Sequence, residues 1–157
     1  MEYLLTEEMI RRTFSEYVDD EISIVMKRGA VTENYISYDW DGVSEDESIQ
    51  TSFSVVLNFA KGTPESIATL DKMWESQNNY VDKDKDMESV SKVGRKASWS
   101  TLGGGQLRVS TDEYLFYFTL ISREINKDNP LEIMRVWNKN YMIEKSSSLG
   151  KEVIEKL

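Results

Sequence analysis

Alternation of apolar and polar residues predicts much of this chain as β-strand. The clearest pattern lies in residues 51–60, where alternate residues from Phe53 to Phe59 are apolar and share one face. Residues 114–121 are apolar on both faces, which is typical of a central strand with other layers packed on each side. Further strands are predicted over residues 21–28, 33–40, 97–102 and 106–110. The pattern therefore indicates a sheet of about six strands.

Two turns are expected to join the strands between residues 97 and 121. Gly103, Gly104 and Gly105 supply the positive φ angles that a hairpin turn requires, and residues 111–112 form the second turn. The glycines could also belong to a phosphate-binding loop. No Lys-Ser or Lys-Thr follows them, however, and strand is predicted on both sides, so a turn is expected.

The strand over residues 106–110 is predicted to have one covered and one wet face. Leu107 and Val109 fall on the covered face, whereas Gln106, Arg108 and Ser110 fall on the face expected to meet solvent. The polar stretch over residues 78–93 is interpreted as a connection that leads into these strands.

Three helices are predicted from a capping residue followed by an apolar stripe. The first is capped by Thr6 and runs to about residue 18. The second and third begin at Thr63-Pro64 and Asn129-Pro130, because a capping side chain followed by proline is typical of a helix start. The serines at 146–148 are expected to interrupt the third helix, with a short terminal helix over 149–157. The three apolar stripes are Ile10, Phe14, Tyr17 and Val18; Ile67, Leu70 and Trp74; and Ile133, Trp137 and Tyr141.

Together these elements predict a single α+β domain over residues 1–157. A chain of 157 residues is long enough to bury a core without disulfides or metals. We expect a mainly antiparallel sheet of about six strands with helices packed on both faces.

Composition excludes several kinds of chemistry. The chain has no cysteine and no histidine, so disulfides, thiolate zinc sites, cysteine nucleophiles and histidine bases are all absent. No apolar run approaches the roughly 20 residues that a bilayer span needs, and no cofactor is expected.

The net charge of −9 is concentrated at one end of the sequence. Residues 1–50 hold 13 acidic and 4 basic side chains, whereas the remaining two thirds are balanced. This distribution disfavours nucleic acid as a partner and favours a basic protein or a cation. The candidate binding residues are Asp39, Asp41, Glu45, Asp46 and Glu47. A solvated loop without a ligand is the alternative.

A second acidic motif resembles part of a calcium loop. Asp82, Asp84 and Asp86 have the spacing of its first three ligands. Met87 stands where that loop needs glycine, and Val93 where it needs a bidentate glutamate, so a solvated loop is expected instead.

Four segments in order resemble a class of small bacterial envelope lipoproteins of unknown function with a PsbP-like fold. They are residues 4–8 (LLTEE), 35–40 (YISYDW), 93–99 (VGRKASW) and 105–109 (GQLRV). The resemblance implies an antiparallel sheet between helices and a binding or accessory role, without catalytic residues to transfer. In many such lipoproteins a cysteine precedes the Ser-Tyr of the strand and forms a disulfide, whereas here that position is Ile36.

The sequence therefore favours a non-enzymatic binding or accessory protein that engages a basic protein partner through its acidic first third. Two alternatives are an inhibitor or immunity-type protein that masks a partner enzyme, and a hydrolase built on paired carboxylates. The compartment depends on the gene: cytoplasmic if Met1 is the native start, cell envelope if a leader was trimmed. The oligomeric state is not predicted.

Overall fold

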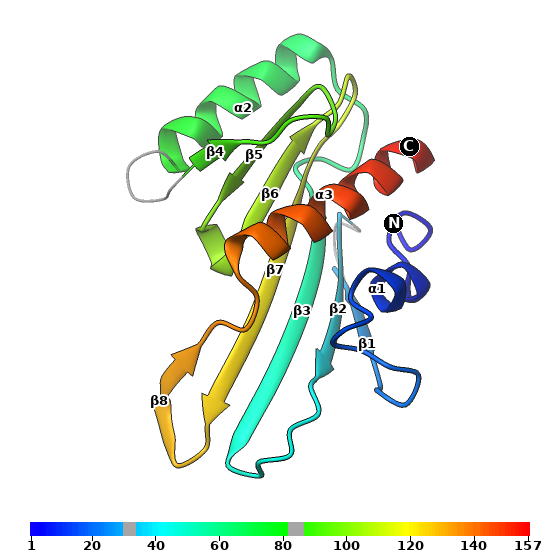
Figure 1. The fold of residues 1–157 in the computed structure, drawn as a ribbon. Helices are drawn as coiled ribbons and strands as arrows, with labels where there is room; N and C mark the ends of the chain where they lie inside the picture. The colour runs from blue at the N-terminus through cyan, green and yellow to red at the C-terminus, as the bar shows by residue number, and fades with distance from the viewer. Residues whose placement is uncertain (30–33, 82–86) are drawn as a thin grey trace.

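A computed structural model describes residues 1–29, 34–81 and 87–157 and shows an α+β fold. An antiparallel sheet of eight strands, in the order β1-β2-β3-β7-β6-β5-β4 with β8 paired to β7, carries three α-helices (Figure 1). The strands are β1 (Val25–Arg28), β2 (Tyr35–Asp41), β3 (Ile49–Phe59), β4 (Met87–Ser89), β5 (Lys96–Ser100), β6 (Gln106–Ser110), β7 (Leu115–Asn126) and β8 (Asn129–Met134). The helices are α1 (Glu7–Thr13), α2 (Ile67–Val81) and α3 (Lys139–Lys156), with a short 3₁₀ turn η1 (Leu102–Gly104).

The six predicted strands correspond to β1, β2, β3, β5, β6 and β7. The sheet is larger than expected because it has two further strands. Strand β4 adds an edge strand next to β5, and β8 forms a hairpin with β7. The centre is the long pairing of β3 with β7, which runs from Ile49 opposite Asn126 to Phe59 opposite Phe116. The apolar alternation of residues 53–59 therefore marks the middle of the sheet.

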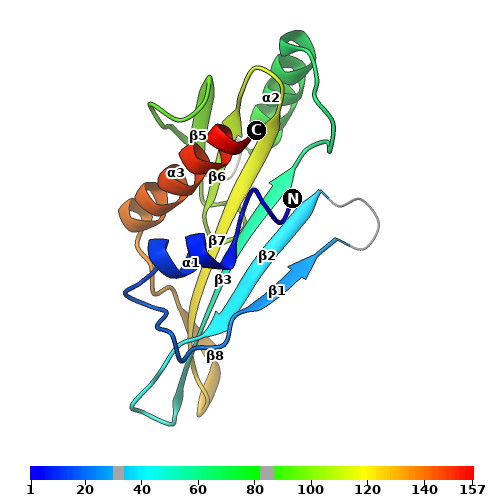
Figure 2. The same cartoon turned by 90° about the vertical axis from the view of Figure 1, so that its right-hand side faces the viewer.

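Helices α1 and α3 cover one face of the sheet, and the main core lies beneath them (Figures 1 and 2). Trp137, in the segment between β8 and α3, is buried at its centre. Its ring stacks on Phe14 of the α1 segment and on Phe53 of β3, with centroids 4.8 and 5.0 Å apart. Its backbone N–H donates to Ser122 Oγ at 2.8 Å. An aromatic cluster thus fixes both helices to the sheet.

The opposite face, which we call the open face, carries only α2 within the described residues, and only at one end (Figure 2). Leu70 and Trp74 of α2 bury Leu115 of β7 in a small separate core. Farther along the same face of β7, Thr119 and Ile121 are partly exposed. The prediction of helices packed on both faces is therefore not met along most of the sheet, because β7 meets a helix on its second face only near its start.

Arg108 and Ser110 were expected in solvent but are buried. They lie on the side of β6 that faces α2, since Arg108 bonds to the backbone of Trp74 in that helix. The alternation over residues 106–110 correctly separates the two faces, but both are covered.

The predicted helix start at Asn129-Pro130 is wrong, because these residues begin strand β8. Asn126 pairs with Asn129 across a tight hairpin, and Asn126 Oδ1 accepts from the backbone N–H of Asp128 at 2.9 Å. Helix α3 begins ten residues later, at Lys139, with Asn138 Oδ1 accepting from Tyr141 N at 2.9 Å.

The predicted break at residues 146–148 is also absent, because α3 is continuous from Lys139 to Lys156. The buried Ser146 hydroxyl donates to the carbonyl of Met142 one turn earlier at 2.6 Å, which satisfies it inside the helix.

The other predicted helix ends shift by a few residues. Thr6 caps α1 as predicted, its Oγ1 accepting from Met9 N at 3.3 Å, but the helix ends at Thr13. Helix α2 begins at Ile67 and not at Pro64, because Ser66 Oγ accepts from Thr69 N at 3.3 Å. It then continues to Val81, into the stretch interpreted as a connection. The calcium-like motif at 82–86 lies outside the described residues. None of the described helices combines the length and apolar character needed to cross a membrane.

The triple glycine forms the predicted turn between β5 and β6. Gly103 and Gly104 have positive φ angles of 65° and 109°. Gly105 differs, since its φ of 169° is ordinary extended backbone. What Gly105 provides is space, because a Cβ there would lie 2.6 Å from the ring of Trp99.

One ion-pair cluster makes the folded state sensitive to acid. Asp71 of α2 accepts from Arg95 Nη2 at 2.8 Å and from Lys96 Nζ at 2.9 Å. These bonds hold the pKa of Asp71 below its ordinary value of 3.8. A depressed folded-state pKa stabilises the protein above pH 3.8, and this contribution is lost as the pH falls through the lower folded-state value.

We therefore expect Asp71→Asn to flatten the loss of thermal stability below pH 3.8, measured as Tm against pH by circular dichroism. Asp128→Asn, at the exposed hairpin turn between β7 and β8, is the control. Equal flattening by the two variants would contradict the assignment.

Candidate functional site

One end of the sheet projects beyond all the helices, and we call it the arm (Figure 1). It comprises residues 41–52 and 121–135, which are the end of β2, the start of β3, the end of β7 and all of β8. Its two halves are joined by backbone, since Lys127 N donates to the carbonyl of Ser48 at 2.7 Å and Ile49 pairs with Asn126. The arm is therefore a continuous part of the sheet.

Large apolar side chains on the arm face solvent. Leu131 of β8 is 95% exposed, and Val43 in the loop between β2 and β3 is 79% exposed. Ile133 and Met134 of β8 are each more than half exposed. Single exposed apolar residues are common on protein surfaces, but a gathering of them on one projecting element is typical of an interaction surface.

The strand register shows how these side chains are arranged. Ile133 lies opposite Ile125, so these two residues share one face of the hairpin. Leu131 lies where the register shifts between the pairs Ile125–Ile133 and Asn126–Asn129. Ile121 lies on the same face of β7, four residues before Ile125. This face is the open face of the sheet, because the alternate residues of β7 point the other way: Ser122, next to Ile121, faces Trp137 and the core. The result is an apolar strip of Ile121, Ile125 and Ile133 on the open face, with the exposed Leu131 at its end toward the hairpin turn.

Two of the predicted binding residues lie beside this strip. Asp39 and Asp41 of β2 are opposite Ser54 and Ser52 of β3, which are in turn opposite Ile121 and Arg123 of β7. A shallow depression of about 510 Å³ is lined by these side chains together with Val25 and Lys27 of β1. Asp39 is already paired there, with Lys27 Nζ 3.0 Å from its Oδ2. Residues 39 and 41 therefore belong to one surface with the strip.

The other three predicted residues lie in the loop at the end of the arm. Glu45, Asp46 and Glu47 are exposed between β2 and β3. Asp46 Oδ1 accepts from Ser48 Oγ at 2.7 Å and from Ser48 N at 2.9 Å, and these bonds lower the pKa of Asp46. The described residues contain no group of three or more carboxylates placed to hold a metal ion, so the geometry gives the cation hypothesis no support.

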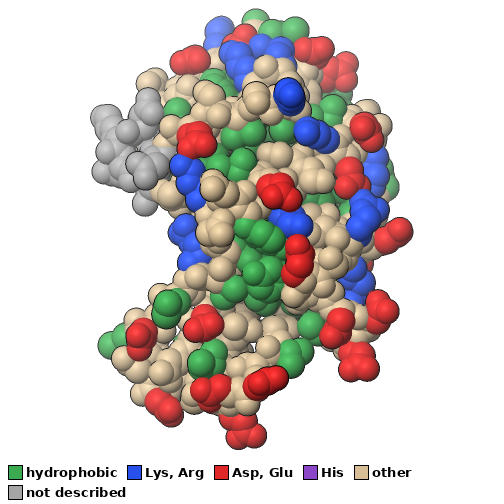
Figure 3. Space-filling view, viewed as in Figure 1, with side chains coloured by type: hydrophobic (Ala, Val, Ile, Leu, Met, Phe, Trp, Pro, Cys, Tyr) green, Lys and Arg blue, Asp and Glu red, His purple; other side chains and the backbone are tan. Residues whose placement is uncertain are grey.

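The arm carries a negative charge. It contains seven acidic and three basic side chains, a net charge of −4. They are Asp41, Glu45, Asp46, Glu47, Glu124, Asp128 and Glu132 against Arg123, Lys127 and Arg135. In the space-filling view, acidic side chains gather over the lower end of the molecule, whereas Lys and Arg side chains lie higher on this face (Figure 3).

Sequence reasoning found the acids of this surface but missed the apolar residues of β8. Residues 131–134 read Leu-Glu-Ile-Met, in which Leu131 and Ile133 alternate with Glu132. That alternation is a strand signal, but the preceding Asn-Pro favoured a helix. A four-residue segment is too short for its periodicity to decide between the two.

The chain was also compared with known proteins. No protein-family model, curated protein or solved structure matches it. The surface of the molecule is therefore the basis for inferring its function.

Proposed function

We propose that this protein is a non-enzymatic binding or accessory protein that holds a basic segment of a protein partner on the open face of its arm. One observation carries the proposal: the apolar strip of β8 and β7 is exposed on an element that projects beyond the helices. Covering an exposed apolar side chain with a partner stabilises the complex by roughly 25 cal/mol per Å² of apolar surface buried.

The charge of the arm specifies the chemistry of the partner. The arm that carries the apolar strip has a net charge of −4, and a segment that combines Lys or Arg with apolar side chains would match both features. A second copy of the chain fits poorly, because each arm has a net charge of −4 and two arms would repel. Long-range attraction to a basic segment also speeds association at low salt.

The resemblance to PsbP-like envelope lipoproteins supports the same kind of role. The antiparallel sheet is a feature that the resemblance implies, whereas the helix layer on the second face is present at only one end of the sheet. The PsbP-like fold is part of the proposal. The four segments that carry the resemblance lie in, or directly before, α1, β2, β5 and β6.

Site-specific photo-cross-linking in the native cell tests the proposal. A photo-reactive amino acid is placed at position 131, the tip of the strip, and at position 80, where Tyr80 is exposed on α2 and far along the chain from the arm. We expect a discrete cross-linked protein from position 131 but not from position 80. Mass spectrometry of the adduct should identify a partner segment rich in Lys or Arg.

Two variants separate the apolar and charged contributions. Leu131→Ser/Ile133→Ser should abolish the adduct formed from a probe at position 125, and Glu45→Lys/Glu47→Lys should weaken it and remove its dependence on salt. Tyr3→Ser, at an exposed residue outside the arm, is the control. An adduct that forms equally from position 80, a partner segment without basic residues, or self-cross-linking alone would each contradict the proposal.

A further inference from the structure

Helix α2 covers one end of the open face and has a small core of its own. That core consists of Leu70 and Trp74 of α2 and Leu115 of β7, and it shares no buried residue with the main core. By contrast, α1 and α3 both contribute buried side chains to the main core on the other face. The apolar contact between α2 and the sheet therefore depends on two buried side chains, Leu70 and Trp74.

Beyond this core, α2 contacts the rest of the protein mainly through polar side chains. Gln77 donates to the hydroxyl of Tyr117. Arg108 of β6 donates to Gln77 Oε1 at 3.3 Å and to Asn78 Oδ1. Asp71 forms the ion pairs described above with a side chain that is 39% exposed. Water can replace bonds of these kinds, so they add little net stability.

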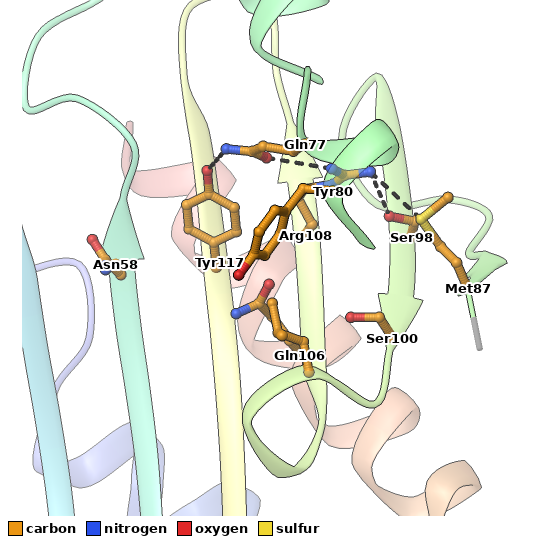
Figure 4. A pocket seen from close by; sticks show the side chains of 10 residues that line it. Asn58, Gln77, Tyr80, Met87, Ser98, Ser100, Gln106, Arg108 and Tyr117 are labelled. Carbon is orange, nitrogen blue, oxygen red and sulfur yellow. Dashed lines mark hydrogen bonds between the residues drawn. The ribbon is translucent and has the colours of Figure 1, made fainter. Parts of the chain in front are cut away.

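A hollow open to solvent lies between the C-terminal half of α2 and the sheet (Figure 4). It has a volume of about 250 Å³, and its lining includes Gln77 and Tyr80 of α2 together with residues of β3, β5, β6 and β7. Atoms beside a void lose the dispersion contacts that close packing provides. The C-terminal half of α2 is therefore held less tightly than the segment that carries Leu70 and Trp74.

Helix α2 covers the same face of β7 that carries the apolar strip farther along. Leu115 and Tyr117 pack against the buried residues of α2. Because side chains alternate along a strand, Thr119 and Ile121 continue that face toward the arm. Removal of α2 would therefore extend the exposed open face along the whole of β7.

We propose that α2 is a cover that leaves the sheet as a unit while the sheet, α1 and α3 remain folded. Its opening breaks the small core and uncovers Leu115 and Tyr117, and it leaves the main core intact. Segments with few buried apolar contacts of their own open in this way below the free energy of global unfolding. The inference concerns the contacts of α2 alone and is independent of what the arm binds.

Native-state hydrogen exchange of the full chain, followed by mass spectrometry, tests the inference. A helix of 15 residues is marginally stable by itself in water, so the backbone N–H groups of α2 exchange when it leaves the sheet. We expect the slowest N–H groups of α2 to exchange at least about tenfold faster than those of α3. Their exchange should also depend less on urea, because the opening exposes less surface than unfolding does.

Two variants separate opening of α2 from global unfolding. Leu70→Ala weakens the small core, which is lost in both processes, so α2 and α3 should each exchange at least about tenfold faster. Val153→Ala weakens the main core, which survives the opening, so only α3 should exchange faster, by about tenfold. Ile67→Ala, at a residue of α2 that is 46% exposed, is the matched control and should change neither rate by more than about threefold.

Three results would overturn the inference. Equal acceleration of α2 and α3 by Val153→Ala would mean that α2 opens only when the whole protein unfolds. Exchange of β6 at the rate of α2 would mean that the sheet opens with the helix. Unchanged exchange of α2 in Leu70→Ala would mean that the small core does not hold the helix on the sheet.

Discussion

Replacing Trp137 with alanine is expected to lower the free energy of unfolding by about 3–5 kcal/mol, the cost typical of deleting a large buried ring. The indole is fully buried and stacks on Phe14 and Phe53 at 4.8 and 5.0 Å. Its loss leaves a cavity where the α1 segment, the sheet and the segment before α3 meet. Urea denaturation followed by circular dichroism measures the change.

Trp137→Phe is the matched control for this experiment. Phenylalanine keeps the stacked ring, and it removes an indole N–H that has no hydrogen-bond partner among the described residues. We therefore expect Trp137→Phe to cost much less than Trp137→Ala. A loss below about 1 kcal/mol for the alanine variant would show that the aromatic cluster does not hold the helices on the sheet.

Gly105→Ala is expected to cost about 1–3 kcal/mol, although it adds a single methyl group. The new Cβ would lie 2.6 Å from Trp99 Cζ2 and 2.9 Å from Met142 Sδ. Trp99 is 1% exposed, and the close packing of protein interiors resists movement of a ring buried in this way. The backbone angle of Gly105 is extended, so the whole penalty comes from this overlap and none from the turn.

A double-mutant cycle isolates that overlap. Trp99→Phe removes the two ring carbons nearest to the new methyl group, so Gly105→Ala should cost less in that background than in the wild type. Thermal and urea unfolding of the four proteins give the coupling energy. Equal costs in both backgrounds would place the strain elsewhere in the turn.

The centre of the sheet could be predicted from the sequence because apolar residues mark the buried positions of its strands, and in the clearest case every second residue is apolar. Residues 53–59 show this directly, whereas residues 114–121 are apolar on both faces and predicted a central strand for that reason; both segments belong to the β3–β7 pair. Short elements were not predictable in the same way. The dipeptide Asn129-Pro130 is compatible with a helix start and with the first residues of a hairpin strand. Pairing with β7, which the local sequence does not encode, selects the strand.

The residues of the candidate sites also differ in how far the sequence predicts them. The acids of the arm follow from charge counting, but the exposure of Leu131 depends on β8 projecting beyond the helices, which no local pattern encodes. Arg108 shows the reverse case. Its polar side chain indicated solvent, whereas the packing of α2 buries it against Trp74, 34 residues earlier in the sequence. Tertiary contacts of this length are absent from a single sequence.

The long pairing of β3 with β7 also has a consequence for synthesis of the chain. It joins residues between 57 positions apart (59 with 116) and 77 positions apart (49 with 126). At about 5–20 residues per second, a ribosome needs roughly 3–15 s to deliver β7 after β3. During that time only β1, β2 and β3 of the central sheet can pair, and β3 is the open edge. The apolar side chains of β3 then lack their partners on β7. An unpaired apolar edge readily pairs with other chains, so the nascent protein is more prone to aggregate than the folded one.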